Sequence, residues 1–367
     1  MKKTLALLLA LCMVFALCAC GSGSAPAATA APAATAAPAA TAAPAAPAAD
    51  AAPAADAAPA DAPADVPAVK ADLTVGTGGE SGTYYAYTGM VGQVVGNHTD
   101  IAMTVVATGG SKDNLVSMDA GMYDLATVQS DVMTYAYNGT NSFAESGALP
   151  NFRVLCALYP ETVQLVTVNP DIKSVADLAG KKVCVGDVGS GTYFNTIDVL
   201  AAYGLTIDDL DVVYQSFGAS TDSMKNGTID AAFVCAGAPT PSITDLCESK
   251  KGSVSLISID DEHMTKLLAD CPWYASITIP GGTYNGVDDD FTTITVKATL
   301  VCTADTPDDV AYTLVKTIFD NKDEITALHE KGSWLSFDFA TDGIAVPFAK
   351  GAAQFFAENG VTVDTVD

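Results

Sequence analysis

The sequence contains very little positive charge. Its 367 residues include 17 lysines and arginines against 43 aspartates and glutamates, which gives a net charge of −26. Arg153 is the single arginine. A surface this acidic repels the phosphates of nucleic acids and of anionic lipids. The composition therefore excludes nucleic acid as a partner and suits a protein that works outside the cytoplasm.

Motifs of several enzyme classes and metal sites are missing as well. The sequence has no Gly-Lys-Ser or Gly-Lys-Thr, and neither Ser81 nor Ser190 lies in Gly-x-Ser-x-Gly. "GTGGES" begins like a dinucleotide fingerprint, but Ser81 replaces its third glycine. There is no HExxH and no CxxC, and His98, His263 and His329 are far apart. We expect no catalytic residue, no metal and no cofactor, although paired carboxylates for glycoside hydrolysis stay open among so many acids.

Six cysteines follow residue 20, and four of them lie in apolar, strand-like runs. In such runs a free thiol behaves as a small buried hydrophobe. Cys247 and Cys271 fall in polar segments that we expect to be exposed, and these two could pair or stay free.

The first twenty residues, "MKKTLALLLALCMVFALCAC", have two lysines and then an apolar run. The run is too short and wrongly flanked for a spanning helix, so it predicts a secretory signal peptide. Its end resembles a bacterial lipobox with small Ala19 before Cys20, which predicts cleavage there and acyl chains on Cys20. An ordinary signal peptide that is cut elsewhere is the alternative. The lipobox places the mature protein on the outer face of the cytoplasmic membrane.

Residues 21–71 are almost entirely Ala, Pro, Thr and Asp. Frequent prolines prevent an alanine helix, and no large apolar side chain is present to be buried. This composition predicts a flexible linker with polyproline-II character.

From residue 72 onward, strand-like and helix-like runs alternate, which is typical of an α/β fold with parallel strands. The run "LTVGT" with "GESGTYYAY" recurs about a hundred residues later as "KKVCVG" with "GSGTYFNTI". The succession continues, with "TGGSKDNLVSMDAGMYDLATVQ" matching "SFGASTDSMKNGTIDAAFVCA". A shared succession of this length predicts two lobes of similar build that face one another across a cleft. We assign residues 72–165 and 289–367 to lobe 1 and residues 166–288 to lobe 2.

Five elements outside the repeat are also predicted. Two consecutive strands are expected at 152–159 and 162–168, and a strand returning to lobe 1 at 292–304. A helix over 306–330 should have Thr306 as its cap and Pro307 at its first position. A last helix lies in 346–359.

Each repeated turn leads from a strand into the N-terminus of a helix, where backbone N–H groups lack partners. Together with the helix dipole they form an anion site suited to carboxylate or phosphate. The alternative is that the glycines only permit tight turns and the hydroxyls only cap helices. A second matched pair of helix starts is Gly109 to Ser111 with Gly218 to Ser220. The two walls of the site comprise Ser81, Gly82, Thr83, Tyr84, Gly110, Ser111, Ser190, Gly191, Thr192 and Tyr193.

The lipobox, the spacer, both Ser-Gly-Thr-Tyr turns, "ALYPETVQLVT" and "AFVCAGAPTPSI" together resemble the TAXI family of extracytoplasmic solute receptors. That resemblance implies a two-lobed, periplasmic-binding-protein-like fold of type II that closes over a small solute. It implies delivery to a TRAP permease with fused small and large subunits, and ligands such as glutamate, glutamine or 2-oxoglutarate. Relatives carry His-Pro-Gly-Ala before the last helix, whereas this chain has Ala349 and Lys350.

Further candidates follow from this arrangement. Arg153 and Tyr159 are expected to reach the cleft, where a guanidinium could grip a carboxylate with two bonds; a surface ion pair is the alternative for Arg153. Binding proteins of ABC importers or of sensors, and more remotely a cell-surface hydrolase, are the rival functions. Open α/β sheets bind ligands at the C-terminal ends of strands, which adds Gln129, Ser130, Gly237 and Ala238.

Overall fold

The computed structural model describes residues 69–366. The predicted signal peptide, Cys20 and nearly all of the predicted linker lie outside the described residues, so those assignments stay predictions. Among the described residues, no helix combines the length and apolar character needed to cross a membrane.

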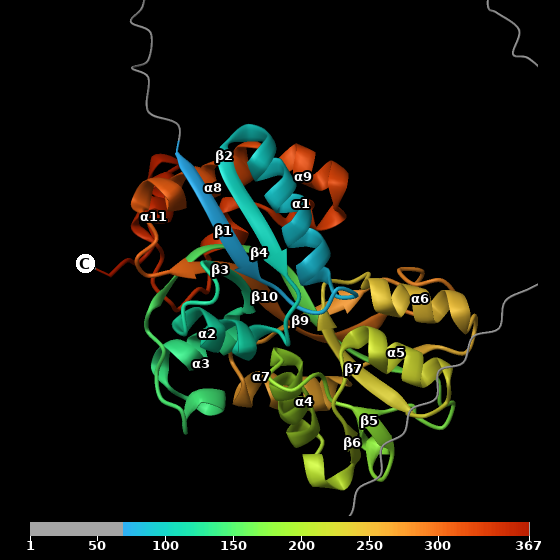
Figure 1. The fold of residues 1–367 in the computed structure, drawn as a ribbon. Helices are drawn as coiled ribbons and strands as arrows, with labels where there is room; N and C mark the ends of the chain where they lie inside the picture. The colour runs from blue at the N-terminus through green and yellow to red at the C-terminus, as the bar shows by residue number, and fades with distance from the viewer. Residues whose placement is uncertain (1–68, 367) are drawn as a thin grey trace, which may run out of the picture. The chain divides into compact units, whose positions relative to one another are not determined.

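The described chain forms one mixed sheet with helices on both sides (Figure 1). Its main path runs β2-β1-β3-β10-β4-β7-β5-β6, with β8 beside β4 and β9 beside β10. The strands are β1 (Lys70–Gly76), β2 (Asp100–Val106), β3 (Leu125–Gln129), β4 (Phe152–Thr167), β5 (Lys182–Cys184), β6 (Asp211–Val213), β7 (Ala231–Ala236), β8 (Ser255–Ile257), β9 (Ala275–Ile279) and β10 (Phe291–Thr303).

The helices follow the strands in alternation through most of the chain. The α-helices are α1 (Thr83–His98), α2 (Ser111–Asp119), α3 (Ser130–Asn138), α4 (Gly191–Ala202), α5 (Phe217–Lys225), α6 (Pro241–Ser249), α7 (Asp261–Asp270), α8 (Asp308–Asp320), α9 (Lys322–Leu328), α10 (Phe337–Thr341) and α11 (Lys350–Glu358). Short 3₁₀ helices are η1 (Asn141–Phe143), η2 (Val175–Leu178), η3 (Ile207–Asp209) and η4 (Glu330–Trp334).

Both halves of the sheet have the same topology. In lobe 1, β1 lies between β2 and β3 and is parallel to both. In lobe 2, β5 lies between β6 and β7 and is again parallel to both. The repeat in the sequence therefore is a repeat of structure, which confirms the predicted α/β class and the two-lobed, binding-protein-like fold.

Two long antiparallel strands connect the lobes. β4 pairs with β10 along most of its length, then with β7 of lobe 2 over residues 162–167. β10 pairs with β9 over 291–295 and with β3 of lobe 1 over 298–302. Each strand thus belongs to both lobes, and its partner changes inside the strand rather than at the predicted boundaries after residues 165 and 288.

The two strands predicted at 152–159 and 162–168 are one continuous strand. Pro160 lies between them and cannot donate a ladder hydrogen bond. It is tolerated inside the ladder, where the N–H of the opposite residue, Lys297, donates to Ser130 Oγ, 3.1 Å away, and not to β4. Pro160 therefore lies close to the point where β4 passes from lobe 1 into lobe 2, and it does not end the strand.

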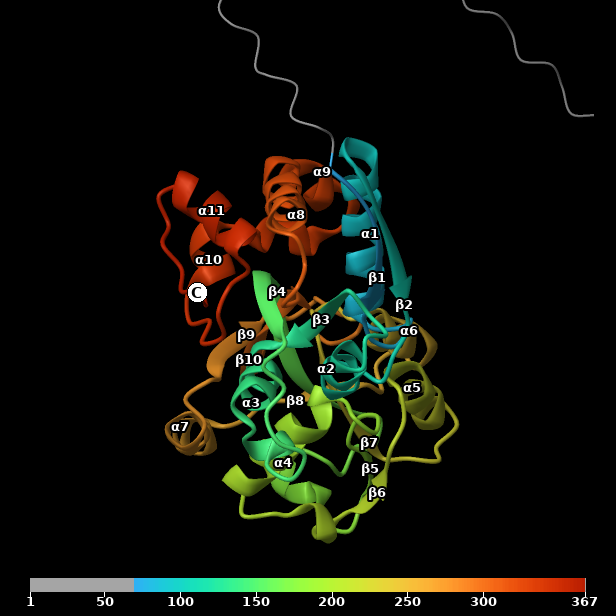
Figure 2. The ribbon, with the colours of Figure 1, turned by 60° about the vertical axis from the view of Figure 1, so that its left-hand side comes forward.

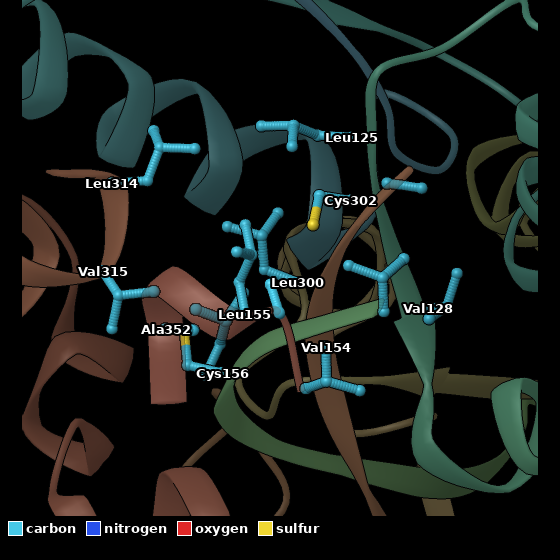
Figure 3. Close-up of a cluster of buried hydrophobic side chains, with 14 of the residues drawn as sticks. Leu125, Val128, Val154, Leu155, Cys156, Leu300, Cys302, Leu314, Val315 and Ala352 are labelled. Atoms are coloured by element: carbon cyan, nitrogen blue, oxygen red, sulfur yellow. The ribbon is translucent and has the colours of Figure 1, made fainter. Parts of the chain in front are cut away.

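The C-terminal helices return to lobe 1. Both views place α8 and α11 in the same lobe as α1 (Figures 1 and 2). Figure 3 shows the core that they cover, in which Leu314 and Val315 of α8 lie close to β4 side chains such as Leu155. Burial of these side chains contributes about 25 cal/mol per Å² of apolar surface. The core is therefore built from segments at both ends of the folded chain.

All six cysteines after residue 20 are free and buried. The expectation that Cys247 and Cys271 are exposed was wrong, and of the two alternatives for these thiols the structure has them free. Cys247 lies on the apolar face of α6 with Ile243 and Leu246, so the polar residues around it in the sequence belong to the opposite face.

Two further elements differ from the sequence expectation. α8 starts at Asp308 and its N-cap is Pro307, so the prediction of Thr306 as the cap was wrong. The single helix predicted over 306–330 is divided, since α8 ends at Asp320 and α9 begins at Lys322. α3 follows β3 without a loop and was not predicted, because its first residues continue a strand pattern.

Candidate functional site

A cavity lies where the N-termini of four helices meet, two from each lobe. α1 and α2 of lobe 1 face α4 and α5 of lobe 2 across it. Its volume is about 530 Å³ when the space that opens to solvent is included. It is lined by Gly78, Gly79, Gly82, Thr83, Tyr84, Thr108, Gly109, Gly110, Ser111, Gln129, Glu161, Asp187, Ser190, Gly191, Thr192, Ser216, Phe217, Cys235 and Ala236.

The helix caps explain why these termini suit an anion. The lobe 1 helices are capped by Gly82 and Gly110, which have no side chain to accept from the first-turn N–H groups. In lobe 2, Ser190 Oγ accepts from Tyr193 N and Ser216 Oγ accepts from Ala219 N, at 3.3 and 3.5 Å. Four positive helix ends around one space favour negative charge there.

Glycine is required at two of these positions by geometry. Gly110 has a φ of 105°, which side chains rarely adopt. At Gly191 a Cβ atom would lie 1.7 Å from Gln129 Oε1, so only glycine permits the amide of lobe 1 to approach α4.

Hydrogen bonds between the lobes close the cavity. Thr83 Oγ1 donates to the carbonyl of Gly237 at 3.1 Å. The N–H groups of Lys112 and Asp113, in the first turn of α2, donate to the carbonyl of Gly189 at 3.1 and 3.2 Å. The structure is thus a closed arrangement, in which part of the α2 terminus already binds lobe 2.

The floor of the cavity comes from the ends of β3 and β7 and from the middle part of β4. Glu161 of β4 lies there and is only 2% exposed. The pKa of Glu161 is raised to about 8, mainly by burial; the Tyr84 hydroxyl lowers it in part and the charge of Asp131 adds to the rise. No lysine, arginine or histidine among the described residues lines the cavity or lies within 4.0 Å of the Glu161 carboxyl group.

A chain of buried polar side chains runs from the floor into the lobe interface. Gln129 Nε2 donates to Cys235 Sγ at 2.8 Å and to Asn195 Oδ1 at 2.9 Å, while Gln129 Oε1 is buried without a partner. Asn195 Nδ2 donates to Asp131 Oδ2 at 3.1 Å and to Tyr274 Oη at 2.9 Å. Burial raises the pKa of Asp131 to about 7. Gln129 therefore couples the cavity to lobe 2 and keeps one acceptor unused.

Nine of the predicted site residues line this cavity, and they come from both matched turns. Their placement agrees with the prediction that the twin turns face one another; ligand binding by them stays a prediction. They are Gly82, Thr83, Tyr84, Gly110, Ser111, Gln129, Ser190, Gly191 and Thr192.

Arg153 does not reach the cleft, so that prediction was wrong. It lies near the start of β4, eight residues before Glu161, or roughly 26 Å at about 3.3 Å per residue. Its Nη1 donates to the carbonyls of Pro150 and Phe152 at 2.8 and 2.7 Å. Tyr159 is closer but fully buried outside the lining, where its ring packs edge-on against Tyr87.

Five more predicted residues lie beside the cavity without lining it. Gly237 and Ala238 contribute carbonyl groups to lobe contacts, the second as acceptor for Lys331 Nζ. Ser130 Oγ accepts from Lys297 N. Tyr193 packs against Phe194 and Tyr214. The carbonyl of Ser81 accepts from Ser242 N at 3.3 Å.

Sequence reasoning missed several lining residues. Ser216 and Phe217 start α5, so the second matched turn begins before the predicted Gly218, which lies inside the helix. Glu161 had a usable signal, since it is a single acid in the otherwise apolar run "ALYPETVQLVT". The other missed residues are Gly78, Gly79, Thr108, Asp187 and Cys235.

Two βα lobes that meet at a cavity and share two long strands define the class of proteins with a two-lobed, periplasmic-binding-protein-like fold. Within it, the chain belongs to the NMT1-like family, whose model matches residues 75–360.

Among solved structures, the chain is similar to the alkanesulfonate-binding protein SsuA from Xanthomonas axonopodis pv. citri bound to MOPS. The identity is 16%, with a TM-score of 0.46, over 79% of this chain and 85% of that one. A putative L-cystine ABC transporter from Listeria monocytogenes matches at 16% identity with a TM-score of 0.43. The match covers 74% of this chain and 99% of that one. The GluR0 ligand-binding core from Nostoc punctiforme in complex with L-glutamate matches at 13% identity with a TM-score of 0.44. The match covers 71% of this chain and 98% of that one.

Proposed function

We propose that this protein is an extracytoplasmic receptor that captures a small carboxylate-bearing solute and delivers it to a membrane transporter. The observation that carries the proposal is the meeting of four helix N-termini, two from each lobe, around one cavity. A ligand held by both lobes stabilises the closed form, which the transporter can then distinguish from the open one.

The chemistry of the lining supports a carboxylate as the group that is held. The lobe 1 helices have glycine caps, so no cap side chain uses their first-turn N–H groups; in α2, however, the N–H groups of Lys112 and Asp113 donate to Gly189 O of lobe 2, which leaves the start of α1 as the freer donor. The hydroxyl-bearing residues Ser111 and Thr192 lie beside the helix starts and add donors. Because no basic side chain among the described residues lines the cavity, backbone amides and hydroxyls do the binding rather than an ion pair.

The transport partner is proposed from the sequence. The resemblance to TAXI receptors supports a TRAP permease with fused small and large subunits, and glutamate, glutamine or 2-oxoglutarate as candidate solutes. The lipobox supports an acyl anchor at Cys20 that holds the receptor on the outer face of the membrane. An ABC importer is the alternative partner, and a gene for a TRAP membrane subunit beside this one would decide between them.

A thermal-shift screen over amino acids, dicarboxylates and 2-oxo acids tests the proposal directly. A true solute at one hundred times its Kd stabilises the folded protein by about 2.7 kcal/mol. We expect saturable stabilisation by at least one carboxylate and recovery of that compound unchanged after incubation. Stabilisation by neutral analogues alone, or conversion of the compound, would contradict the proposal.

A further inference from the structure

Glu161 is the one acidic side chain buried in the floor of the cavity. It lies where β4 passes from one lobe to the other, and its carbonyl accepts from Thr295 Oγ1 at 2.7 Å, which fixes the backbone. The titratable groups around its carboxyl are Tyr84 of α1, Tyr159 of β4, Cys235 of β7 and Asp131 of α3. All of these are neutral or acidic, so nothing in the surroundings compensates a negative charge on Glu161.

The lysines of the neighbouring elements are engaged elsewhere. Lys297 of β10 donates through Nζ to the carbonyl of Phe339, at 2.8 Å. Lys331 of η4 donates to Ala238 O on the lobe contact, and Lys112 of α2 donates to Ser142 O at 2.7 Å. A buried carboxylate without a cation is unfavourable, so Glu161 in the closed protein either carries a proton or meets a positive charge that the solute brings.

A second acceptor lies beside the cavity, where it faces Gly191 at the start of α4. Gln129 Oε1 is buried and has no hydrogen-bond donor, and its amide nitrogen is fixed by Cys235 and Asn195. An ammonium group has three donors, and it would satisfy both the Glu161 carboxylate and this carbonyl oxygen. The floor thus offers acceptors, whereas the helix starts offer donors.

We infer that Glu161 is the specificity-determining residue of the cleft, where it receives the ammonium group of an α-amino acid whose carboxylate lies at the helix N-termini. The inference rests on the proposed function and narrows its ligand from carboxylates in general to zwitterions. Gln129 assists as a second acceptor. A 2-oxo acid of the same shape fits the helix starts but leaves Glu161 without its partner.

The two kinds of ligand have different pH dependence. In the open protein Glu161 faces water and ionises near its usual pKa, and closure without a cation raises that pKa. Binding of a 2-oxo acid therefore takes up one proton, and its affinity falls as the pH rises from about 5 to 8, by at most tenfold per pH unit. An amino acid supplies the cation, so its affinity stays nearly constant over the same window.

The test compares matched pairs by isothermal calorimetry on the full-length protein: glutamate with 2-oxoglutarate, aspartate with oxaloacetate, and alanine with pyruvate. At pH 7.5 we expect one amino acid to bind at least about 30-fold more tightly than its 2-oxo partner. Glu161→Gln should lower the affinity for that amino acid by a similar factor and make 2-oxo acid binding independent of pH. Glu145→Gln, which removes an equal charge from an exposed loop position, should change neither.

A receptor that binds only carboxylates without an amine, or that binds both members of a pair equally at every pH, overturns the inference and leaves the proposed function intact. Failure of every carboxylate to bind overturns both. The pH comparison uses the natural sequence, so the result does not depend on how well the Glu161→Gln variant folds.

Discussion

Thr83 and Gly237 join the two lobes at the edge of the cavity, where Thr83 Oγ1 donates to the Gly237 carbonyl at 3.1 Å. Thr83 is the first residue of α1 and Gly237 follows β7, so one hydrogen bond connects the helix start of lobe 1 to a strand end of lobe 2. The same threonine lines the cavity. Lobe closure and the shape of the site therefore depend on a shared group.

Replacing Thr83 with valine should weaken solute binding. The change removes the hydroxyl but keeps the side-chain shape, and a hydrogen bond of this kind contributes about 1 kcal/mol, or roughly fivefold in affinity. The melting temperature of the ligand-free protein should shift by only a few degrees. Calorimetry checks the affinity, and Thr83→Ser, which keeps the hydroxyl, should behave like the natural protein. Equal affinities for the valine and serine variants would rule out the hydrogen bond as a contributor.

Thr192 offers the matching test in lobe 2. Its side chain lines the cavity at the start of α4. Thr192→Val should lower solute affinity by roughly threefold to tenfold, because a ligand donor is lost and the cavity becomes more apolar. Thr362→Val, at an exposed position near the C-terminus, is the control. An affinity that Thr192→Val leaves unchanged would show that this hydroxyl only serves the helix.

Gly191→Ala should block closure. The added Cβ would overlap Gln129 Oε1 at 1.7 Å, so the two lobes cannot approach as they do here. We expect at least a tenfold loss of affinity and no compaction on adding solute in small-angle X-ray scattering. Gly96→Ala, in α1, meets no atom closer than 3.7 Å and should bind normally. Normal binding by the Gly191 variant would mean that the solute does not need this closed form.

Stability should fall as the pH rises from about 4 to 7. Asp131 has a folded-state pKa of about 7 because it is buried, whereas its unfolded value is 3.8. The folded state therefore binds more protons within this window, and raising the pH favours unfolding by a few kcal/mol. Asp131→Asn should flatten the dependence of the melting temperature on pH. A melting temperature that rises steadily over this range would contradict the assignment.

Cys20→Ala should abolish membrane anchoring. Without the thiol no acyl chain can be attached, so we expect the protein in the medium or as an unprocessed precursor in membranes. Fractionation and the size of the mature chain distinguish these forms. Normal processing with membrane retention would show that Cys20 is not the anchor.

Much of the architecture could be predicted because it depends on local patterns. The twin succession of strand, turn and helix gave two lobes with the same strand order, and the Ser-Gly-Thr-Tyr turns brought Thr83 and Thr192 to one cavity. The prediction that Arg153 reaches the cleft was wrong, because the distance of Arg153 from the cleft depends on how far β4 extends before it passes into the other lobe. The prediction that Cys247 is exposed was wrong, because the side of α6 that is buried depends on which elements pack against the helix.

The sequence by itself determined the acidic surface, the alternation of strands and helices and the glycines at the helix starts, since each follows from composition or from spacing along the chain. Only the tertiary structure decided that Glu161 and Gln129 meet on one floor with no cation beside them. Those two residues belong to β3 and β4, which are far apart in the chain, and both line one cavity because β10 pairs with both strands. Long-range strand pairing sets such neighbours, and no local pattern encodes it.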